Sequence, residues 1–248
     1  MTDTAMEKIL ICIDDTDDLD SIGTGELLEN LCAAMEKAGL GRAGFVTRHQ
    51  LLISDRIAYT SHNSSMCCAA ETGDLPALLK LAGSYLEANC APSSDPGLCV
   101  FRCGEPAEGL SEFGRRAQRE VLTKDDAYAA AAGYPGRVFL SEHGGSGEGI
   151  IGALAGVGLR LTGNDGRIKG KIRPEVPGEI LTAAEFCRRY HVARLRSDAG
   201  ETASPDDLVR FDEQTKAVLL DDLITLPADR QDGFWIPRPK KPPGKDKG

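Results

Sequence analysis

No stretch of the sequence is apolar over the roughly 18 residues that a membrane-spanning helix needs. The first residues, Met1 to Glu7, are acidic and lack the apolar centre of a signal peptide. These absences predict a cytoplasmic protein with no membrane partner. Of the 248 residues, 41% are hydrophobic and 27% charged, which excludes collagen-like, disordered and disulfide-scaffold proteins. One large globular domain or two small ones are expected.

Cys-x-x-Cys pairs are also absent. The chain has eight cysteines, but without such a pair a zinc ribbon or a thioredoxin-type site is unsupported. Cys99 and Cys103 have a spacing compatible with metal ligation, yet they lie in a strand-like run. The four histidines are scattered and form no metal motif. Buried, reduced cysteines are therefore predicted for most of the eight.

A dense run of positive charge occurs only at the end of the sequence. The net charge is −9, and the segment from Arg238 to the end carries +4, so residues 1–237 carry −13. A body this negative is a poor general partner for the phosphates of RNA or DNA. It suits a small substrate, a metal–nucleotide complex or a cationic amine.

The order of apolar patterns predicts a mixed α/β (α+β) fold. Residues 8–13 read as a buried strand, and helical spacing follows from residue 27 to 38. Strand-like segments at 43–53 and 66–70, a helix after Asp74 and a strand at 98–101 complete the order β-α-β-β-α-β. This is the order of a ferredoxin-like unit, here predicted over residues 1–105.

A second mixed α/β part is predicted over residues 106–236. Helical patterns occupy 110–121 and 125–132, a strand 137–140, the start of a helix 150–155, and a further helix 182–190. Hairpins are expected around 163–166, between 159–162 and 167–172, and from 208–211 to 217–220. Residues 237–248 form a basic tail that is expected to be disordered.

Five aspartates lie within seven residues directly after the first strand, from Asp14 to Asp20. Ligands tend to bind in the loop that follows a strand's carboxyl end. Clustered carboxylates repel one another, and Mg²⁺, which binds carboxylates and substrate phosphates, is a natural counter-charge. Asp14, Asp15 and Asp17 are the predicted metal and catalytic residues. The alternative is an Asp-rich turn or an exposed acidic loop.

Two glycine-containing segments are candidates for holding phosphate. Thr24, between Gly23 and Gly25, begins a predicted helix; spacing alone favours a helix cap over a phosphate ligand. The second segment is a turn between a strand and a helix, whose N–H groups could cradle phosphate. Its candidate residues are Gly144, Gly145, Ser146, Gly147 and Gly149. Ile150 stands where a Walker A loop requires Lys, and a flexible connector is the alternative.

A polar stretch from Tyr59 to Ser65 precedes an apolar run. Seven consecutive residues with hydrogen-bonding side chains could bind a polar substrate, for which the candidates are Tyr59, His62, Asn63 and Ser64. The alternative is a loop whose side chains bond to their own backbone.

The stretch Ile13–Asp17, followed by Thr24, resembles the opening of the archaeal agmatinylcytidine synthetase family. There, Ile-Asp-Asp-Thr-Asp is followed by a short spacer and Cys-Thr-Thr. Residues 57–65 are similar to a polar loop of that family that contains Pro-Tyr-x-Thr. Residues 149–158 are similar to its segment Gly-Val-Ile-Gly-Ala-Leu-Ala-Ala-Val-Gly. Three matches in the same order are more specific than any one alone.

That family modifies the wobble cytidine of an isoleucine tRNA with ATP and agmatine. The resemblance implies an ATP-dependent kinase-like domain joined to a ferredoxin-like domain. For this chain it implies that Asp14, Asp15 and Asp17 bind Mg²⁺ and ATP. It also implies that Thr24 is a phosphoryl acceptor or phosphate ligand rather than a cap.

The sequence departs from the family in three respects. Gly23-Thr24-Gly25 replaces Cys-Thr-Thr, and residues 144–147 are Gly and Ser where the family has arginines. The sequence also stops before the OB-fold and zinc-ribbon domains that hold tRNA in that family. Together with the negative charge of residues 1–237, these departures argue against tRNA as the substrate.

The motifs therefore predict an ATP- and Mg-dependent transferase or ligase that transfers a phosphoryl or nucleotidyl group. A small substrate is favoured, and a cationic amine such as agmatine fits the negative charge. Two alternatives stay open: a tRNA-modifying protein that works with a separate RNA-binding partner, and a non-catalytic ligand-binding module. Homodimer formation is also open.

Overall fold

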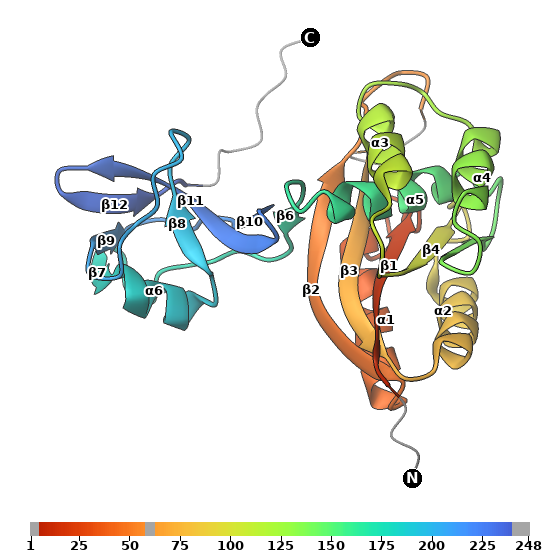
Figure 1. Cartoon of the computed structure of the whole chain (residues 1–248), viewed down its shortest axis with the longest axis horizontal. Coiled ribbons are helices and arrows are strands. Elements are labelled where there is room, and N and C mark those ends of the chain that lie inside the picture. The colour runs from red at the N-terminus through yellow and green to blue at the C-terminus, as the bar shows by residue number, and fades with distance from the viewer. Residues whose placement is uncertain (1–4, 58–62, 240–248) are drawn as a thin grey trace. The chain divides into compact units, whose positions relative to one another are not determined.

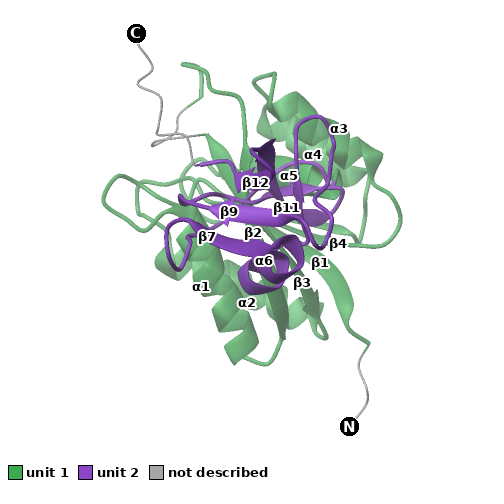
Figure 2. Ribbon diagram, turned by 90° about the vertical axis from the view of Figure 1, so that its left-hand side faces the viewer, with its two compact units in different colours: residues 1–162 green, residues 163–248 purple. Residues whose placement is uncertain are grey.

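The computed structural model describes residues 5–57 and 63–239, so Tyr59 and His62 lie outside the described residues. The chain divides into two compact units, residues 1–162 (unit 1) and residues 163–248 (unit 2) (Figure 2). The boundary that the sequence suggested at residue 105 lies inside unit 1. The reason is that the helices after residue 105 pack on the same sheet as the elements before it.

An antiparallel sheet organises the described part of unit 1 (Figure 1). Its strands are β1 (Glu7–Asp14), β2 (Gly41–Gln50), β3 (Ser64–Thr72), β4 (Gly97–Arg102) and β5 (Val138–Glu142). They lie in the order β5-β4-β1-β3-β2, and each pairs antiparallel with its neighbours. Helix α1 (Thr24–Lys37) connects β1 to β2, and α2 (Leu75–Asn89) connects β3 to β4. The predicted β-α-β-β-α-β order is confirmed, with the strand pairing of a split βαβ unit.

Both faces of this sheet are buried. Ile9, Ile11 and Ile13 of β1 pack with α1 and α2 on one face, and Leu10 and Cys12 lie in a second core on the other. The second face is covered by α3 (Glu108–Ala117), α4 (Lys124–Ala132) and α5 (Gly149–Leu161) (Figure 1). Because side chains alternate between two dry faces, β1 reads as a continuous apolar run.

Unit 2 is a smaller mixed α/β body with its own core. Its elements are β6 (Arg167–Ile168), β7 (Glu179–Thr182), α6 (Ala183–Tyr190), β8 (Arg194–Arg196), β9 (Leu208–Phe211), β10 (Val218–Leu220), β11 (Leu223–Gln231) and β12 (Phe234–Pro237). The strand order is β6-β10-β11-β12-β9-β7, and β8 pairs parallel with β11. Phe186, Phe211 and Trp235 are buried at its centre. Thr182 caps α6 and Glu185 bonds back to it, which confirms the predicted helix there.

Both predicted hairpins are wrong. Residues 159–161 belong to α5, so the turn at 163–166 follows a helix and not a strand. Strands β9 and β10 exist, but β9 pairs with β7 and β12, and β10 pairs with β6 and β11. The turn that joins β10 to β11 is Asp221-Asp222, and both residues have positive φ, as a tight two-residue hairpin requires.

The cysteine prediction is confirmed. All eight cysteines are free thiols; Cys12, Cys32, Cys67, Cys68 and Cys99 are buried and the other three are half-buried. Within residues 5–57 and 63–239, no helix combines the length and the apolar character needed to cross a membrane.

Candidate functional site

The aspartate loop leaves the sheet through a sharp turn. Asp14 is the last residue of β1, and Asp15 adopts a left-handed backbone with φ of 51°. Asp tolerates this conformation better than most residues do, because its short side chain bonds locally. Thr16 is then buried, and its carbonyl accepts a hydrogen bond of 3.0 Å from the N–H of Ala91. The first turn of the loop is thus fixed at one end by β1, through Asp14, and at the other by the hydrogen bond between Thr16 and Ala91.

Thr24 lies beside Asp17 at the start of α1. Gly23, not Thr24, is the N-cap residue, so the cap alternative for Thr24 is wrong. The Thr24 hydroxyl donates a hydrogen bond of 2.8 Å to Asp17 Oδ1, and the side chain is buried. Thr24 and Gly25 occupy the first helical positions, where backbone N–H groups have no partner within the helix. The structure therefore brings three predicted site residues, Asp17, Thr24 and Gly25, together at the start of α1.

Helix α5 begins directly against the aspartate loop. A Cβ atom on Gly149 would lie 2.7 Å from the carbonyl oxygen of Asp14 and 2.6 Å from the N–H of Gly97. A Cβ atom on Gly152 would overlap the carboxylate oxygen Oδ2 of Asp14. Only glycine permits this approach, which brings the glycine-rich turn to the carboxyl end of β1.

Two acidic residues that are not among the predicted site residues, Asp95 and Glu148, complete the site. Asp95 accepts hydrogen bonds from the N–H of Ser146, through Oδ1, and from the N–H of Gly149, through its carbonyl. Its charge, with those of Asp17 and Glu148, acts on Asp15. Asp95 is a single carboxylate before Pro96 and Gly97, so the sequence gives no signal for it. Glu148, between Gly147 and Gly149 at a helix start, could have been noticed.

Burial and mutual repulsion raise the pKa values of two carboxyl groups. For Asp14, burial is the main cause, followed by the charge of Asp15, and the pKa rises to about 8. For Asp15, burial is followed by the charges of Asp95, Asp17 and Glu148, and the pKa rises to about 6. The neighbouring charges that shift both groups are negative. A bound cation would relieve this repulsion and favour both ionised forms.

The donor set suits magnesium that arrives with phosphate. Among residues 5–57 and 63–239, no three His, Cys, Asp or Glu side chains converge closely enough to hold a metal ion by themselves. The structure thus does not assemble Asp14, Asp15 and Asp17 into an all-protein metal cage. Mg²⁺ usually binds through one or two carboxylates together with waters and substrate phosphates. Asp14 and Asp15 fit that arrangement.

The glycine-rich turn is held in place by hydrogen bonds. Gly144, Gly145 and Gly147 have positive φ, which opens the turn toward Asp95. Lys124 of α4 donates a hydrogen bond of 2.6 Å to the carbonyl of Ser146 and forms an ion pair of 2.9 Å with Glu142. These bonds do not fit a flexible connector. A phosphate that used the Ser146 N–H would replace the Asp95 carboxylate there.

Two described residues of the polar stretch, Asn63 and Ser64, do not converge on this site. The side chain of Asn63 donates a hydrogen bond of 2.7 Å to the carbonyl of Leu52. Ser64 Oγ accepts a hydrogen bond of 3.0 Å from Arg48 Nε. For Asn63, this bond matches the alternative that the side chains of the polar stretch bond to nearby backbone groups. Tyr59 and His62 lie outside the described residues, so their predicted roles stay predictions.

A buried polar row lies next to Asp14 across the sheet. Ser65 pairs with His49 of β2, and the β1–β3 register, with Ile13 opposite Met66, places Asp14 beside Ser65. Thr47 Oγ1 donates to the carbonyl of Cys67 and lies 2.7 Å from His49 Nε2, so Nε2 must be the donor to Thr47. Ser65 Oγ is buried and has no hydrogen-bond partner among the described residues.

No protein-family model matches the sequence, and no curated protein matches it significantly. Solved structures do match the fold. A complex of TiaS with an isoleucine tRNA and ATP is 25% identical, with a TM-score of 0.54, over 61% of this chain and 36% of that one. Apo TiaS, an agmatidine synthetase that acts on this tRNA, is 22% identical, with a TM-score of 0.55, over 75% and 44%.

A third match covers almost all of this chain. It is a complex of TiaS with the isoleucine tRNA, AMPCPP and agmatine, 18% identical with a TM-score of 0.55, over 93% of this chain and 60% of that one. This chain thus spans between 36% and 60% of the length of these three TiaS chains. The resemblance seen in the sequence is confirmed at the level of the fold.

Proposed function

We propose that unit 1 binds ATP with Mg²⁺ and transfers a phosphoryl or nucleotidyl group. The observation that carries this proposal is the convergence of Asp14, Asp15 and the Asp17–Thr24 pair with the start of α5. The fold similarity to a TiaS complex that contains ATP supports the choice of nucleotide. ATP and Mg²⁺ are therefore the proposed cofactors.

Each residue has a distinct task in this proposal. Asp14 and Asp15 hold Mg²⁺, which neutralises the charge of the transferred phosphate. Asp17 orients the Thr24 hydroxyl through their 2.8 Å hydrogen bond. Free N–H groups at the start of α1, and the positive end of that helix, favour the phosphate oxygens.

The Thr24 hydroxyl is the phosphoryl acceptor that we propose. A nucleophile within hydrogen-bonding distance of a base is the arrangement that activates a hydroxyl. In the proposed step, Thr24 Oγ1 bonds to the γ-phosphorus of ATP, the bond from that phosphorus to the bridging oxygen breaks, and ADP leaves. The hydroxyl proton passes to Asp17, so atoms and charge balance.

The second substrate is proposed from charge. Unit 1 contains 23 Asp and Glu against 13 Lys and Arg, a net charge of −10. A cationic amine suits such a surface, and agmatine is present in a TiaS complex of similar fold. The same complex contains an isoleucine tRNA, so a tRNA-modifying reaction that joins an amine to RNA is the overall activity we propose.

The test is ATP turnover with matched variants. Purified protein is incubated with Mg²⁺ and ATP, and ADP, AMP and the mass of the Thr24 peptide are measured. We expect Asp15→Asn to lower turnover at least about 100-fold, because removing one charge-stabilising group typically costs that much. Asp20→Asn, in the same loop but exposed, is the control and should turn over like the wild type.

Each outcome has a defined meaning. A phosphorylated Thr24 that is lost in Thr24→Ala supports the acceptor role, and ADP without modified Thr24 limits that residue to phosphate binding. ATP binding without turnover, in the presence of amine and tRNA, favours the ligand-binding module. An ATP titration with no binding would contradict the proposal.

A further inference from the structure

Positively charged residues alternate with apolar ones at the start of unit 2. Arg167, Lys169, Lys171 and Arg173 stand at every second position, and no acidic residue lies between 166 and 174. Ile168 and Ile172 pack against the core of unit 2. A bend at Gly170, which has a φ of 101°, separates the two isoleucines. On either side of the bend the isoleucines are partly buried, whereas Arg167, Lys171 and Arg173 are exposed.

Hydrogen bonds fix the backbone of this segment. The N–H of Ile168 donates 2.9 Å to the carbonyl of Ala217. Ile172 and Thr215 exchange two backbone bonds, of 3.0 and 2.8 Å. The backbone of this segment is therefore held in place, and its cations do not have to be ordered from a flexible loop.

Three of these cations have no partner within the described residues. Arg167, Lys171 and Arg173 are exposed and take part in no hydrogen bond or ion pair there. Other arginines of unit 2 are neutralised: Arg189 by Glu179, Arg194 and Arg196 by Asp221, Arg210 by Asp212, and Arg238 by Asp229. Within the described residues of unit 2, this segment contributes three exposed cations that have no ion pair, and Arg188 is another.

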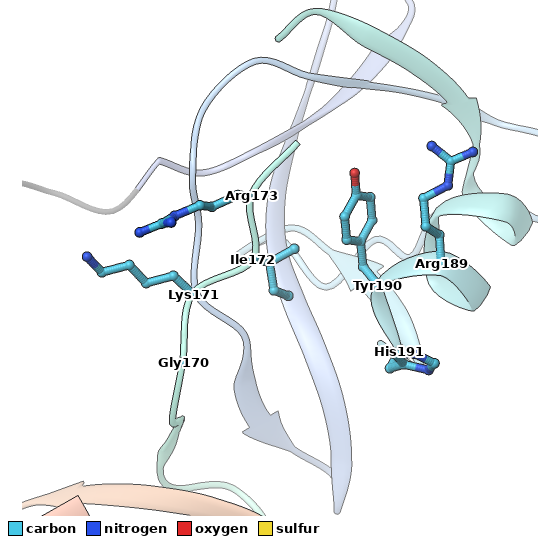
Figure 3. Close-up of a pocket in the computed structure, with 7 residues that line it drawn as sticks. All are labelled: Gly170, Lys171, Ile172, Arg173, Arg189, Tyr190 and His191. Atoms are coloured by element: carbon cyan, nitrogen blue, oxygen red, sulfur yellow. The ribbon is translucent and has the colours of Figure 1, made fainter. Parts of the chain in front are cut away.

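A surface pocket of about 700 Å³ borders the segment (Figure 3). Lys171 and Arg173 extend to one side, whereas Ile172 points toward Tyr190. Arg189 also lines the pocket, but Glu175 and Glu179 neutralise its charge. Lys171 and Arg173 therefore present their charges on the side of the segment away from Ile172 and Tyr190.

Charge counted over the whole chain conceals this feature. The net charge of −9 consists of −10 on unit 1 and +1 on unit 2, and the +1 includes the +4 of residues 238–248, so residues 163–237 carry −3. Residues 167–173 are thus a local positive segment within a weakly negative part of unit 2.

We propose that Arg167, Lys171 and Arg173 form a binding surface for the phosphate backbone of an RNA strand. The choice of RNA rests on the proposed function. Three exposed cations spread over residues 167–173 match a row of phosphates rather than a single one. Contacts of this kind position an RNA without reading its sequence.

The test is RNA binding by the whole chain at several salt concentrations. The probes are unfractionated tRNA and a mixed-sequence 20-nucleotide RNA, with inorganic tripolyphosphate as competitor. In the double variant Lys171→Ala/Arg173→Ala, we expect about tenfold weaker binding at 50 mM salt. We also expect the slope of log affinity against log salt to fall by about 1.4 for the single strand. Arg188→Ala, an exposed cation of the same unit, is the control and should bind within about twofold of the wild type.

Several results would overturn the assignment. These are wild-type protein that does not bind RNA, a double variant that binds normally, or a control that weakens binding equally. Efficient competition by tripolyphosphate at equal phosphate concentration would indicate a site for free phosphates instead. ATP turnover is measured on the same variants and should be unchanged, so a failure of the nucleotide proposal is seen separately. Matching thermal unfolding curves verify that each variant folds.

Discussion

At the scale of single residues, the surroundings of Asp14 and Asp15 disfavour the ionised forms of both carboxyl groups. Burial and neighbouring carboxylates raise their pKa values to about 8 and about 6. An unfolded chain has both values near 4. Between pH 4 and 8 the folded state therefore holds protons that the unfolded state has lost. The protein without metal should become less stable as pH rises through this range.

This gives a measurable slope. In metal-free buffer, the free energy of unfolding in urea should fall by about 1.4 kcal/mol per pH unit for each group at pH values between its unfolded and folded pKa. Asp14→Asn should flatten the slope between pH 6 and 8, where Asp15 is already ionised. Mg²⁺ with ATP should stabilise the wild type more at pH 8 than at pH 5. An unchanged slope in Asp14→Asn would show that Asp14 is not the titrating group.

A second residue-scale prediction concerns the buried row beside Asp14. Ser65 Oγ is buried without a partner among the described residues, so Ser65→Ala removes an unsatisfied group and should stabilise the protein by about 1 kcal/mol. Thr47→Val should destabilise it by about 1–3 kcal/mol, because the Thr47 hydroxyl bonds to Cys67 and His49. Urea unfolding of both variants is the measurement. Equal destabilisation by both would mean that Ser65 is bonded in solution.

At the scale of elements, α5 decides where the Asp14 carboxylate lies. A Cβ atom at position 152 overlaps that carboxylate, whereas Gly→Ala in a helix interior otherwise stabilises by up to about 1 kcal/mol. We expect Gly152→Ala to rotate Asp14 out of place and to lower kcat/KM for ATP about 100-fold, with little loss of stability.

The control for this variant is Gly133→Ala at the end of α4. There the nearest atom to an added Cβ is 3.4 Å away and the backbone φ is −68°. Turnover should match the wild type. If Gly152→Ala retains full turnover, the position of Asp14 does not limit the reaction.

At the scale of the whole molecule, the two units have separate cores. The nucleotide residues belong to unit 1, and the aromatic core around Phe186 and Trp235 belongs to unit 2. A ligand stabilises the part of the chain that binds it. Hydrogen exchange with Mg²⁺ and ATP should slow in β1, α1 and the start of α5 and stay unchanged in unit 2. Equal protection of both units would contradict a nucleotide site confined to unit 1.

The sequence by itself determined the local features of this protein. Two-sided burial is visible in the apolar run of β1, helical spacing in α1, and the Asp17–Thr24 pair in a segment of eight residues. These features depend on neighbours in the chain, whose geometry the backbone fixes.

Only the tertiary structure decided which distant segments meet. Asp95 and Glu148 join Asp15 because β4 pairs with β1 and α5 approaches both strands through glycine. The same holds for the partners of β9 and β10, and for the boundary at residue 162. Strand pairing and helix packing are set by burial against residues far away in the sequence, and no periodicity within one segment records which partner it will find.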